Sequence, residues 1–128
     1  MIVPLRSLKA IRNVRFSFPA IAEALPGEPS RSLFLVTRET EHRQARLHQR
    51  LVFDGGEDPA TGSASGCVAA WMVRHGLARS GEQVLLEQGL EIHRPSRIYV
   101  RAERGGDRVL NVRVGGGVVE VKRGEYSL

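Results

Sequence analysis

The chain has 128 residues, of which 41% are hydrophobic and 26% charged, an ordinary composition for a globular protein of one domain. No apolar run approaches the ~20 residues that cross a bilayer, and the apolar opening is too short for a signal peptide, so we expect a cytoplasmic protein without a membrane partner. The net charge of +5 raises nucleic-acid binding as a candidate function. The arginines are scattered, however, and the seven aromatic residues are too few to interleave with them, so no nucleic acid is expected.

Short elements fill the first quarter of the chain. Residues 2–5 favour a strand, and Ser7 is placed to cap a brief helix that ends at Asn13. A second helix is predicted over residues 19–25, because proline suits a first helical turn. Residues 26–29 (PGEP) end that helix.

Two strands are predicted next. Residues 32–37 form a continuous apolar run, which indicates a buried strand. Residues 46–53 alternate, which predicts a half-exposed strand. Its apolar face contains Leu47, Leu51 and Phe53, and its polar face contains Arg46, His48 and Arg50.

A loop over residues 54–59 leads into a helix that starts at Thr61 or Ser63, ends at His75 and is closed by Gly76 in a left-handed cap. The helix is apolar nearly all round, so we expect it to be enclosed at the centre of the domain. Cys67 lies one turn into it and is expected to pack in the core. As the single cysteine, it excludes an internal disulfide and a cysteine-based zinc cluster.

The remainder of the chain favours strands. They are predicted over residues 83–87, 97–102, 108–114 and 118–122, with tight connections at residues 105–107 and 115–117. The first of these connections has the chemistry of a hairpin turn. The pattern predicts a β-rich domain that curls around one buried helix.

The segment EDPATGSA, residues 57–64, combines several features of an anion-binding site directly before the apolar helix. Gly62 lets the backbone approach a ligand closely, and Ser63 places a hydroxyl at the first turn. The unpaired N–H groups of that turn, with the positive end of the helix dipole, attract a carboxylate or a phosphate. Asp58 is placed to hold or move a proton. These residues by themselves name no reaction.

A structural interpretation of the same residues is also open. Thr61 or Ser63 can cap the helix, and Asp58 can help to satisfy the same N–H groups. Arg94 and Arg97 can likewise bind an anion or simply solvate the edge of a strand. The four histidines show no spacing typical of metal ligands, so no metal site is expected.

EDPATGSA resembles the signature of the PhzF-like proteins of phenazine biosynthesis, in the diaminopimelate epimerase superfamily. Further similarities follow in the same order along the chain. They are Val73-Arg74-His75-Gly76, Glu87-Gln88-Gly89, residues 94–98 (RPSRI) and residues 112–119 (VRVGGGVV). With the opening residues 2–5, the resemblance covers essentially the whole chain, but it corresponds only to the second half of a typical family member.

The resemblance implies an α+β fold, a diaminopimelate epimerase-like half in which a curved, mostly antiparallel sheet wraps around one central buried helix. Residues 1–128 would then be a single domain equivalent to the C-terminal half of such an isomerase. Family members shift a proton on a small acidic metabolite without metal, pyridoxal phosphate or nucleotide, so no cofactor is expected. Their active site lies in the cleft between two similar domains.

By the same resemblance, Asp58 and Ser63 are the candidate catalytic residues, and Thr61, Gly62 and Ala64 are candidates for substrate binding. The general base of the family, a glutamate, and its assisting histidine come from the first domain and have no counterpart in this chain. His93 is a second departure, because the family usually has glycine there; the histidine is expected to alter the loop or to fill part of the cleft.

Two functions fit these residues. In the first, the chain is half of a cofactor-independent isomerase or epimerase that acts on a small anionic metabolite, together with a separately encoded N-terminal half-domain or as a homodimer. It would be inactive without a partner that carries the catalytic glutamate. In the second, it is a split or truncated domain that keeps small-anion binding or only structural association, without turnover.

Overall fold

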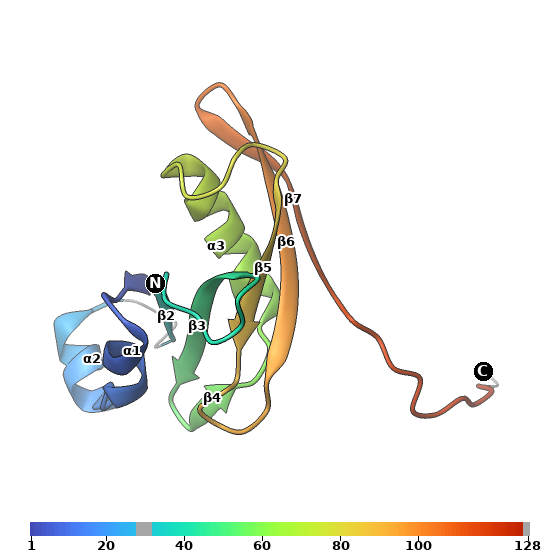
Figure 1. Ribbon diagram of the computed structural model, residues 1–128. Coiled ribbons are helices and arrows are strands. Elements are labelled where there is room, and N and C mark those ends of the chain that lie inside the picture. The colour runs from blue at the N-terminus through green and yellow to red at the C-terminus, as the bar shows by residue number, and fades with distance from the viewer. Residues whose placement is uncertain (28–31, 127–128) are drawn as a thin grey trace.

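The computed structural model describes residues 1–27 and 32–126, which form a curved mixed sheet with three helices (Figure 1). The helices are α1 (Leu8–Asn13), α2 (Phe18–Ala24) and α3 (Gly62–Arg74). The strands are β1 (Ile2–Pro4), β2 (Leu33–Thr37), β3 (Ala45–Phe53), β4 (Gly56–Asp58), β5 (Gln83–Gln88), β6 (Ser96–Gly105) and β7 (Arg108–Gly116).

The sheet has the order β1-β2-β3-β5-β6-β7, and β4 pairs with the end of β3 beside this path. The β1–β2 and β3–β5 pairs are parallel. The β2–β3, β3–β4, β5–β6 and β6–β7 pairs are antiparallel. The predicted α+β class, with a mostly antiparallel sheet, is therefore confirmed.

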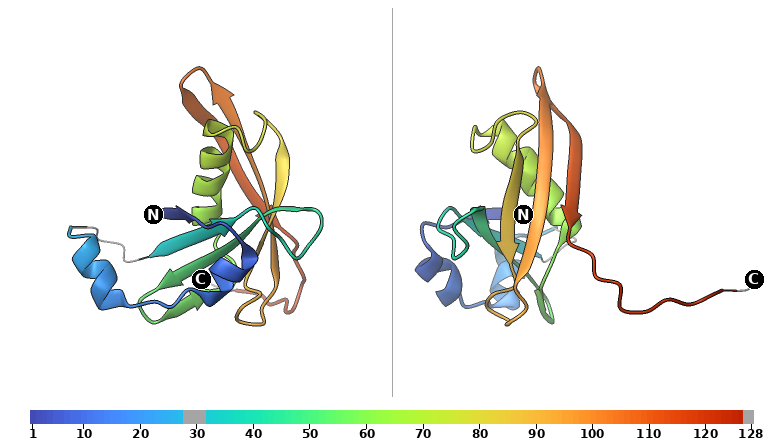
Figure 2. Two further views of the ribbon diagram at one scale, coloured as in Figure 1. Left: turned by 60° about the vertical axis from the view of Figure 1, so that its left-hand side comes forward. Right: turned by 45° about the vertical axis from the view of Figure 1, so that its right-hand side comes forward.

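α3 lies in the hollow of the sheet, which curls around it as a half-barrel (Figures 1 and 2). Val68 and Met72 of α3 have no exposed surface and pack with apolar side chains of the strands, among them Leu86 and Val100. Burying a side chain of this size contributes about 1.5–3 kcal/mol. The predicted arrangement of one central helix within a curved sheet is thus confirmed.

The expectation that α3 is enclosed on every side is wrong. Ser63, Cys67 and Arg74 are exposed, and their spacing of four and seven residues places them along one side of the helix. Cys67 is therefore not a core residue in the described part of the chain. A half-barrel covers only the helix faces that its strands reach, so apolar composition alone did not ensure burial. No helix in the described ranges is long and apolar enough to span a membrane.

β3 is buried on both faces, whereas its alternation predicted a half-exposed strand. Leu47 belongs to the core around α3, while His48 and Arg50 lie on the opposite face, where their exposed fractions are 0% and 8%. α1 covers this second face, since Arg50 donates a hydrogen bond from Nη1 to the carbonyl of Ile11 at 2.8 Å. Period-two alternation correctly predicted which residues share a face, but it carries no information about a helix from elsewhere that packs there.

Three of the predicted connections have different outcomes. Residues 54–59 are not entirely a loop, because β4 forms there and pairs with β3. The hairpin turn between β6 and β7 is confirmed, with Gly106 at a φ of 61°. The predicted turn at residues 26–29 falls partly outside the described residues.

The strand predicted over residues 118–122 is not formed. Gly115 and Gly116 belong to β7 instead of a tight connection, and the chain then leaves the sheet as a long tail (Figure 1). In this tail Val118, Val119 and Val121 are between 81% and 95% exposed. A strand requires a neighbour to pair with, and the described residues offer none at this place.

Candidate functional site

The N-terminus of α3 is not capped by a side chain. Thr61 occupies the N-cap position, but its hydroxyl makes no hydrogen bond to the helix amides and donates instead to Asp58 Oδ2 at 2.7 Å. Asp58 Oδ1 accepts a hydrogen bond from the N–H of Ala60 at 3.2 Å, ahead of the helix. Thr61 thus occupies the N-cap position expected of it, but the side chains of Thr61 and Asp58 do not satisfy the helix amides, so the positive end of α3 keeps its capacity for an anion.

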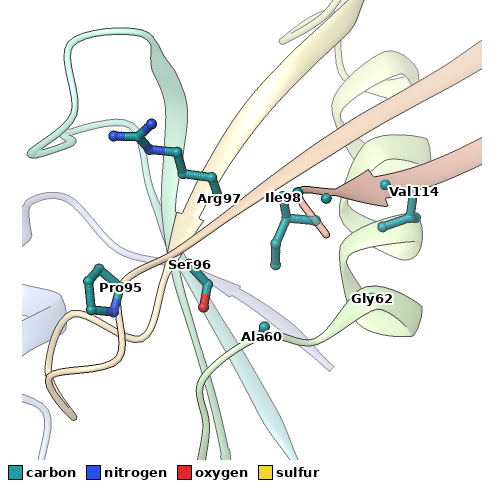
Figure 3. A pocket seen from close by; sticks show the side chains of 10 residues that line it. Ala60, Gly62, Pro95, Ser96, Arg97, Ile98 and Val114 are labelled. Carbon is teal, nitrogen blue, oxygen red and sulfur yellow. The ribbon is translucent and has the colours of Figure 1, made fainter. Parts of the chain in front are cut away.

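A cleft of about 500 Å³ opens beside this helix start (Figure 3). Its walls come from the loop before α3, the start of β6 and the end of β7. The lining residues are Ala60, Gly62, Pro95, Ser96, Arg97, Ile98, Val114, Gly115, Gly116 and Gly117. Figure 3 shows the side chain of Arg97 directed away from Gly62. None of these lining residues is an aspartate, glutamate or histidine. The wall therefore offers backbone groups to a ligand, but no carboxylate or imidazole that could move a proton.

The five predicted site residues lie together around this helix start. Gly62 lines the cleft, and Ser63 follows it with an exposed side chain. Asp58 and Ala64 are half-buried, and Thr61 is buried. Asp58 is thus held against the helix start by two hydrogen bonds and does not point freely into bulk water.

A buried polar network behind the helix start was missed by the sequence reasoning. Gln88, the last residue of β5, donates from Nε2 to the Asp58 carbonyl at 2.7 Å and to Thr61 Oγ1 at 2.9 Å. Its Oε1 accepts from the Thr61 N–H at 3.3 Å and from Gln49 Nε2 at 2.9 Å. Gln49 also donates to Ser65 Oγ at 2.7 Å, and Ser65 donates to the Thr61 carbonyl at 2.6 Å. A polar residue at an inward position of an alternating strand, as at Gln49, was the signal in the sequence.

An ion pair on the other face of the sheet holds β4 in place. Arg50 donates two hydrogen bonds to the Glu57 carboxylate, at 3.0 Å from Nε and 2.6 Å from Nη2. Such a two-pronged contact fixes direction as well as distance. The carboxylate of Glu57 raises the pKa of Arg50 against the opposing effect of burial. Because Glu57 immediately precedes Asp58, this pair anchors the backbone that carries the candidate catalytic carboxylate.

His48 lies between two carboxylates beside that ion pair. Its Nδ1 is 2.9 Å from Glu87 Oε1, and its Nε2 is 2.9 Å from Glu91 Oε1. Burial opposes the charged ring, but the hydrogen bonds and charges of Glu91 and Glu87 outweigh it and raise the pKa of His48. Burial likewise opposes the charge of Glu91, yet His48 and Arg50 lower the pKa of that carboxyl. Each ring nitrogen thus lies within hydrogen-bond distance of a carboxylate, an arrangement that favours the charged ring because only that form donates in both directions.

The loop between β5 and β6 packs tightly on the loop that precedes α3. Gly89 has a φ of 80°, and a Cβ added there would lie 2.3 Å from the Arg94 carbonyl oxygen and 2.8 Å from that of Pro59. Further along, His93 has a φ of 57°, which is the left-handed conformation that glycine adopts most easily. His93 is exposed and is not among the residues that line the cleft. Its backbone therefore keeps a conformation suited to the glycine that the resemblance led us to expect there.

The half-barrel of a mixed sheet around one helix is an α+β arrangement of the PhzF and epimerase type. The chain belongs to the PhzC-PhzF family of phenazine biosynthesis-like proteins, whose family model matches residues 1–124. The suspected family is thereby confirmed.

Individual relatives agree with this assignment. An uncharacterized isomerase of Mesorhizobium japonicum is 32% identical over 133 residues, which cover 98% of this chain and 44% of that protein. The trans-2,3-dihydro-3-hydroxyanthranilate isomerase of Pseudomonas aeruginosa is 52% identical over 60 residues, covering 47% of this chain and 22% of the relative. The chain thus spans less than half the length of the relatives that it matches.

Solved structures show the same fold. A PhzF-family phenazine biosynthesis protein of Bacillus anthracis superposes with a TM-score of 0.75 at 22% identity, over 92% of this chain and 45% of the other. A predicted epimerase of Pseudomonas aeruginosa gives a TM-score of 0.59 at 32% identity, over 88% of this chain and 38% of the other. Both matches again cover less than half of the longer protein.

Proposed function

We propose that the chain supplies one wall of the active site of an isomerase or epimerase that shifts a proton on a small carboxylate-bearing metabolite. The observation that carries this proposal is the start of α3, which lacks a side-chain cap, opens beside a cleft of about 500 Å³ and has the Asp58 carboxylate tied to its N-cap residue. The names of the relatives support the reaction type, since two of them are isomerases.

The backbone amides, the Asp58 carboxylate and the Ser63 hydroxyl have separate roles in the proposed reaction. The backbone N–H groups at Gly62 and Ser63, at the positive end of α3, bind the carboxylate of the substrate. Asp58 accepts a proton from the substrate or returns one, and the exposed Ser63 hydroxyl assists as a hydrogen-bond donor. The reaction removes a proton from one carbon and delivers a proton to another position or face, so the atoms balance without a further reactant. The proposal uses no cofactor.

The proposed site needs a second lobe to complete it, because no aspartate, glutamate or histidine lines the cleft and Asp58 lies outside that lining. We propose that this lobe is an N-terminal half-domain or a second copy of this chain. Val112 and Val114 of β7 are 44% and 41% exposed, and the tail beyond them carries Val119 at 81% and Tyr126 at 95%. Exposed apolar side chains of this kind would be available for contact with the proposed second lobe.

Solvent-deuterium exchange tests the proposed reaction. The full chain, affinity-tagged, is purified with the lobe that binds it, and trans-2,3-dihydro-3-hydroxyanthranilate is offered in D₂O, because that compound names the Pseudomonas relative. Asp58→Asn should lower deuterium incorporation about 10²–10⁴-fold, since an amide cannot carry the proton. The fold should persist, because the asparagine carbonyl can still accept one of the two hydrogen bonds that Asp58 receives.

Asp54→Asn is the matched control, since Asp54 is an exposed acid four positions before Asp58. Incorporation at the wild-type rate in Asp58→Asn would remove Asp58 from the mechanism. The cleft wall contains Arg97 but no aspartate, glutamate or histidine, which also favours a second candidate function, a non-catalytic domain that binds small anions. That function predicts carboxylate binding without deuterium incorporation in every assembly that the chain forms.

A further inference from the structure

We propose that Gln88 is a positioning residue, which directs the Thr61 hydroxyl toward Asp58 and so holds the Asp58 carboxylate in one orientation. The inference rests on the proposed function, because Asp58 is the group proposed to move the proton. Gln88 does not line the cleft and would act only through Thr61 and the backbone of Asp58.

The side-chain amide of Gln88 makes all four hydrogen bonds of which it is capable. A glutamine amide has two donors and an oxygen with two acceptor sites. Nε2 donates to the Asp58 carbonyl and to Thr61 Oγ1, while Oε1 accepts from the Thr61 N–H and from Gln49. The side chain has no exposed surface, so water does not compete for these four contacts. Three of the four partners belong to residues 58 and 61.

The direction of each hydrogen bond decides where the Thr61 proton goes. Because Gln88 Nε2 donates to Thr61 Oγ1, the hydroxyl hydrogen is free for another acceptor, and Asp58 Oδ2 lies 2.7 Å away. With the Gln88 amide reversed, its oxygen would face the Thr61 hydroxyl and would compete with Asp58 for that hydrogen. The observed orientation of Gln88 therefore supplies Asp58 with a hydrogen bond that the reversed orientation would weaken.

Gln49 holds Gln88 in this orientation at a cost in stability. Its Nε2 donates to Gln88 Oε1 and to Ser65 Oγ, and its own Oε1 is buried without a hydrogen-bond partner in the described part of the chain. A buried acceptor without a partner destabilises the folded state. This arrangement is understandable if both N–H groups of Gln49 are needed to keep the Gln88 oxygen turned away from the Thr61 hydroxyl.

NMR on the chain alone tests the inference without any assumption about activity. In an equal mixture of H₂O and D₂O, a slowly exchanging threonine hydroxyl splits the signal of its own ¹³Cβ into two resonances. Thr61 should show this splitting in the wild type, and Gln88→Met should accelerate hydroxyl exchange about tenfold or more and collapse it. Gln83→Met, at the exposed start of the same strand, should leave the splitting intact.

Gln88→Glu provides a second variant in case the methionine variant does not fold. The glutamate keeps the size and the acceptor for the Thr61 N–H, but as a carboxylate it donates no hydrogen bond to Thr61 Oγ1. The carboxylate that Gln88→Glu introduces would compete with Asp58 for the Thr61 hydroxyl hydrogen, so the ¹³Cγ signal of Asp58 should move as that hydrogen bond weakens. Retention of the Thr61 splitting in folded Gln88→Met, or an unmoved Asp58 ¹³Cγ signal in folded Gln88→Glu, would overturn the inference.

The assembled enzyme then separates positioning from general structural support. Gln88→Met should lower kcat with little change in KM, and Thr61→Val should do the same. The double variant should be no slower than Thr61→Val alone, because both changes interrupt one path to Asp58. Losses that multiply would contradict the inference. If the wild-type assembly incorporates no deuterium into the substrate, the proposed function fails. The NMR result on the Thr61 hydroxyl still decides whether Gln88 positions Asp58.

Discussion

At the level of single residues, the raised pKa of His48 predicts how the stability of the fold depends on pH. The pKa of His48 is raised in the folded state above its ordinary value of 6.5, so its stabilising contribution is complete below that value and is lost as the pH rises through the folded pKa. The pKa of Glu91 is lowered from its ordinary 4.5, so its contribution is present above that value and is lost as the pH falls through the folded pKa. The pair therefore stabilises the fold most between these two ordinary values.

Replacing His48 should remove this pH dependence. His48→Gln should lower the free energy of unfolding by about 3 kcal/mol near pH 6, because the carboxylates of Glu87 and Glu91 lose the buried ring that lies between them. Urea denaturation at pH values from about 5 to about 9 should show wild-type stability falling above pH 6.5, and a flatter profile in the variant. His75→Gln, at an exposed position, serves as the control. Equal slopes in His48→Gln and the wild type would contradict the role given to His48.

The residue types of the site could be predicted from the sequence, but their partners could not. EDPATGSA placed Asp58, Gly62 and Ser63 at the start of a helix because the motif is contiguous in the chain. Gln88 lies 27 residues beyond Thr61 and meets it only because β3 and β5 pair side by side. Such contacts depend on strand order, which alternation within one strand does not reveal.

At the scale of elements, the joint between the β5–β6 loop and the loop before α3 should be intolerant of any side chain at Gly89. An alanine there would meet two carbonyl oxygens at 2.3 and 2.8 Å with a positive φ, so the two loops would have to separate. We expect Gly89→Ala to lower the free energy of unfolding by more than about 2 kcal/mol. Thermal unfolding measures this effect directly.

Gly117→Ala is the control for this joint. Gly117 lines the cleft, and a Cβ added there meets nothing within 4 Å, so the stability of the Gly117→Ala variant should change little. A Gly89→Ala variant as stable as Gly117→Ala would show that the two loops are not held together as described.

Elements with a strong local signal were predictable, and those that depend on a neighbour were not. α3 and its Gly76 cap, with a φ of 70°, follow from a long apolar run ended by glycine. β4 was missed because Gly-Glu-Asp has little strand propensity and forms a strand through its pairing with β3 and the Arg50–Glu57 contact. Residues 118–122 show the reverse case, in which apolar alternation predicted a strand that has no neighbour to pair with.

At the scale of the whole molecule, the fold was predictable because the resemblance extends over nearly the full chain. The half-barrel buries α3 on the sheet side and leaves Ser63, Cys67 and Arg74 open on another. The tail extends away from the sheet with its valines exposed (Figure 1). These open surfaces, in a chain that spans 44% of a longer relative, agree with the proposal that a second lobe completes the site.

If the open start of α3 binds the carboxylate of a small metabolite, an NMR titration of the full chain detects that binding at the amides of the first helical turn. 3-Hydroxyanthranilate is added to the ¹⁵N-labelled chain, and 2-aminophenol, which lacks the carboxylate, is added to a matched sample. We predict saturable shifts of the Gly62 and Ser63 amide signals with the carboxylate compound alone, with a Kd on the order of 1 mM for one wall of the site. Equal shifts with both compounds, or none at these two amides, would contradict the account.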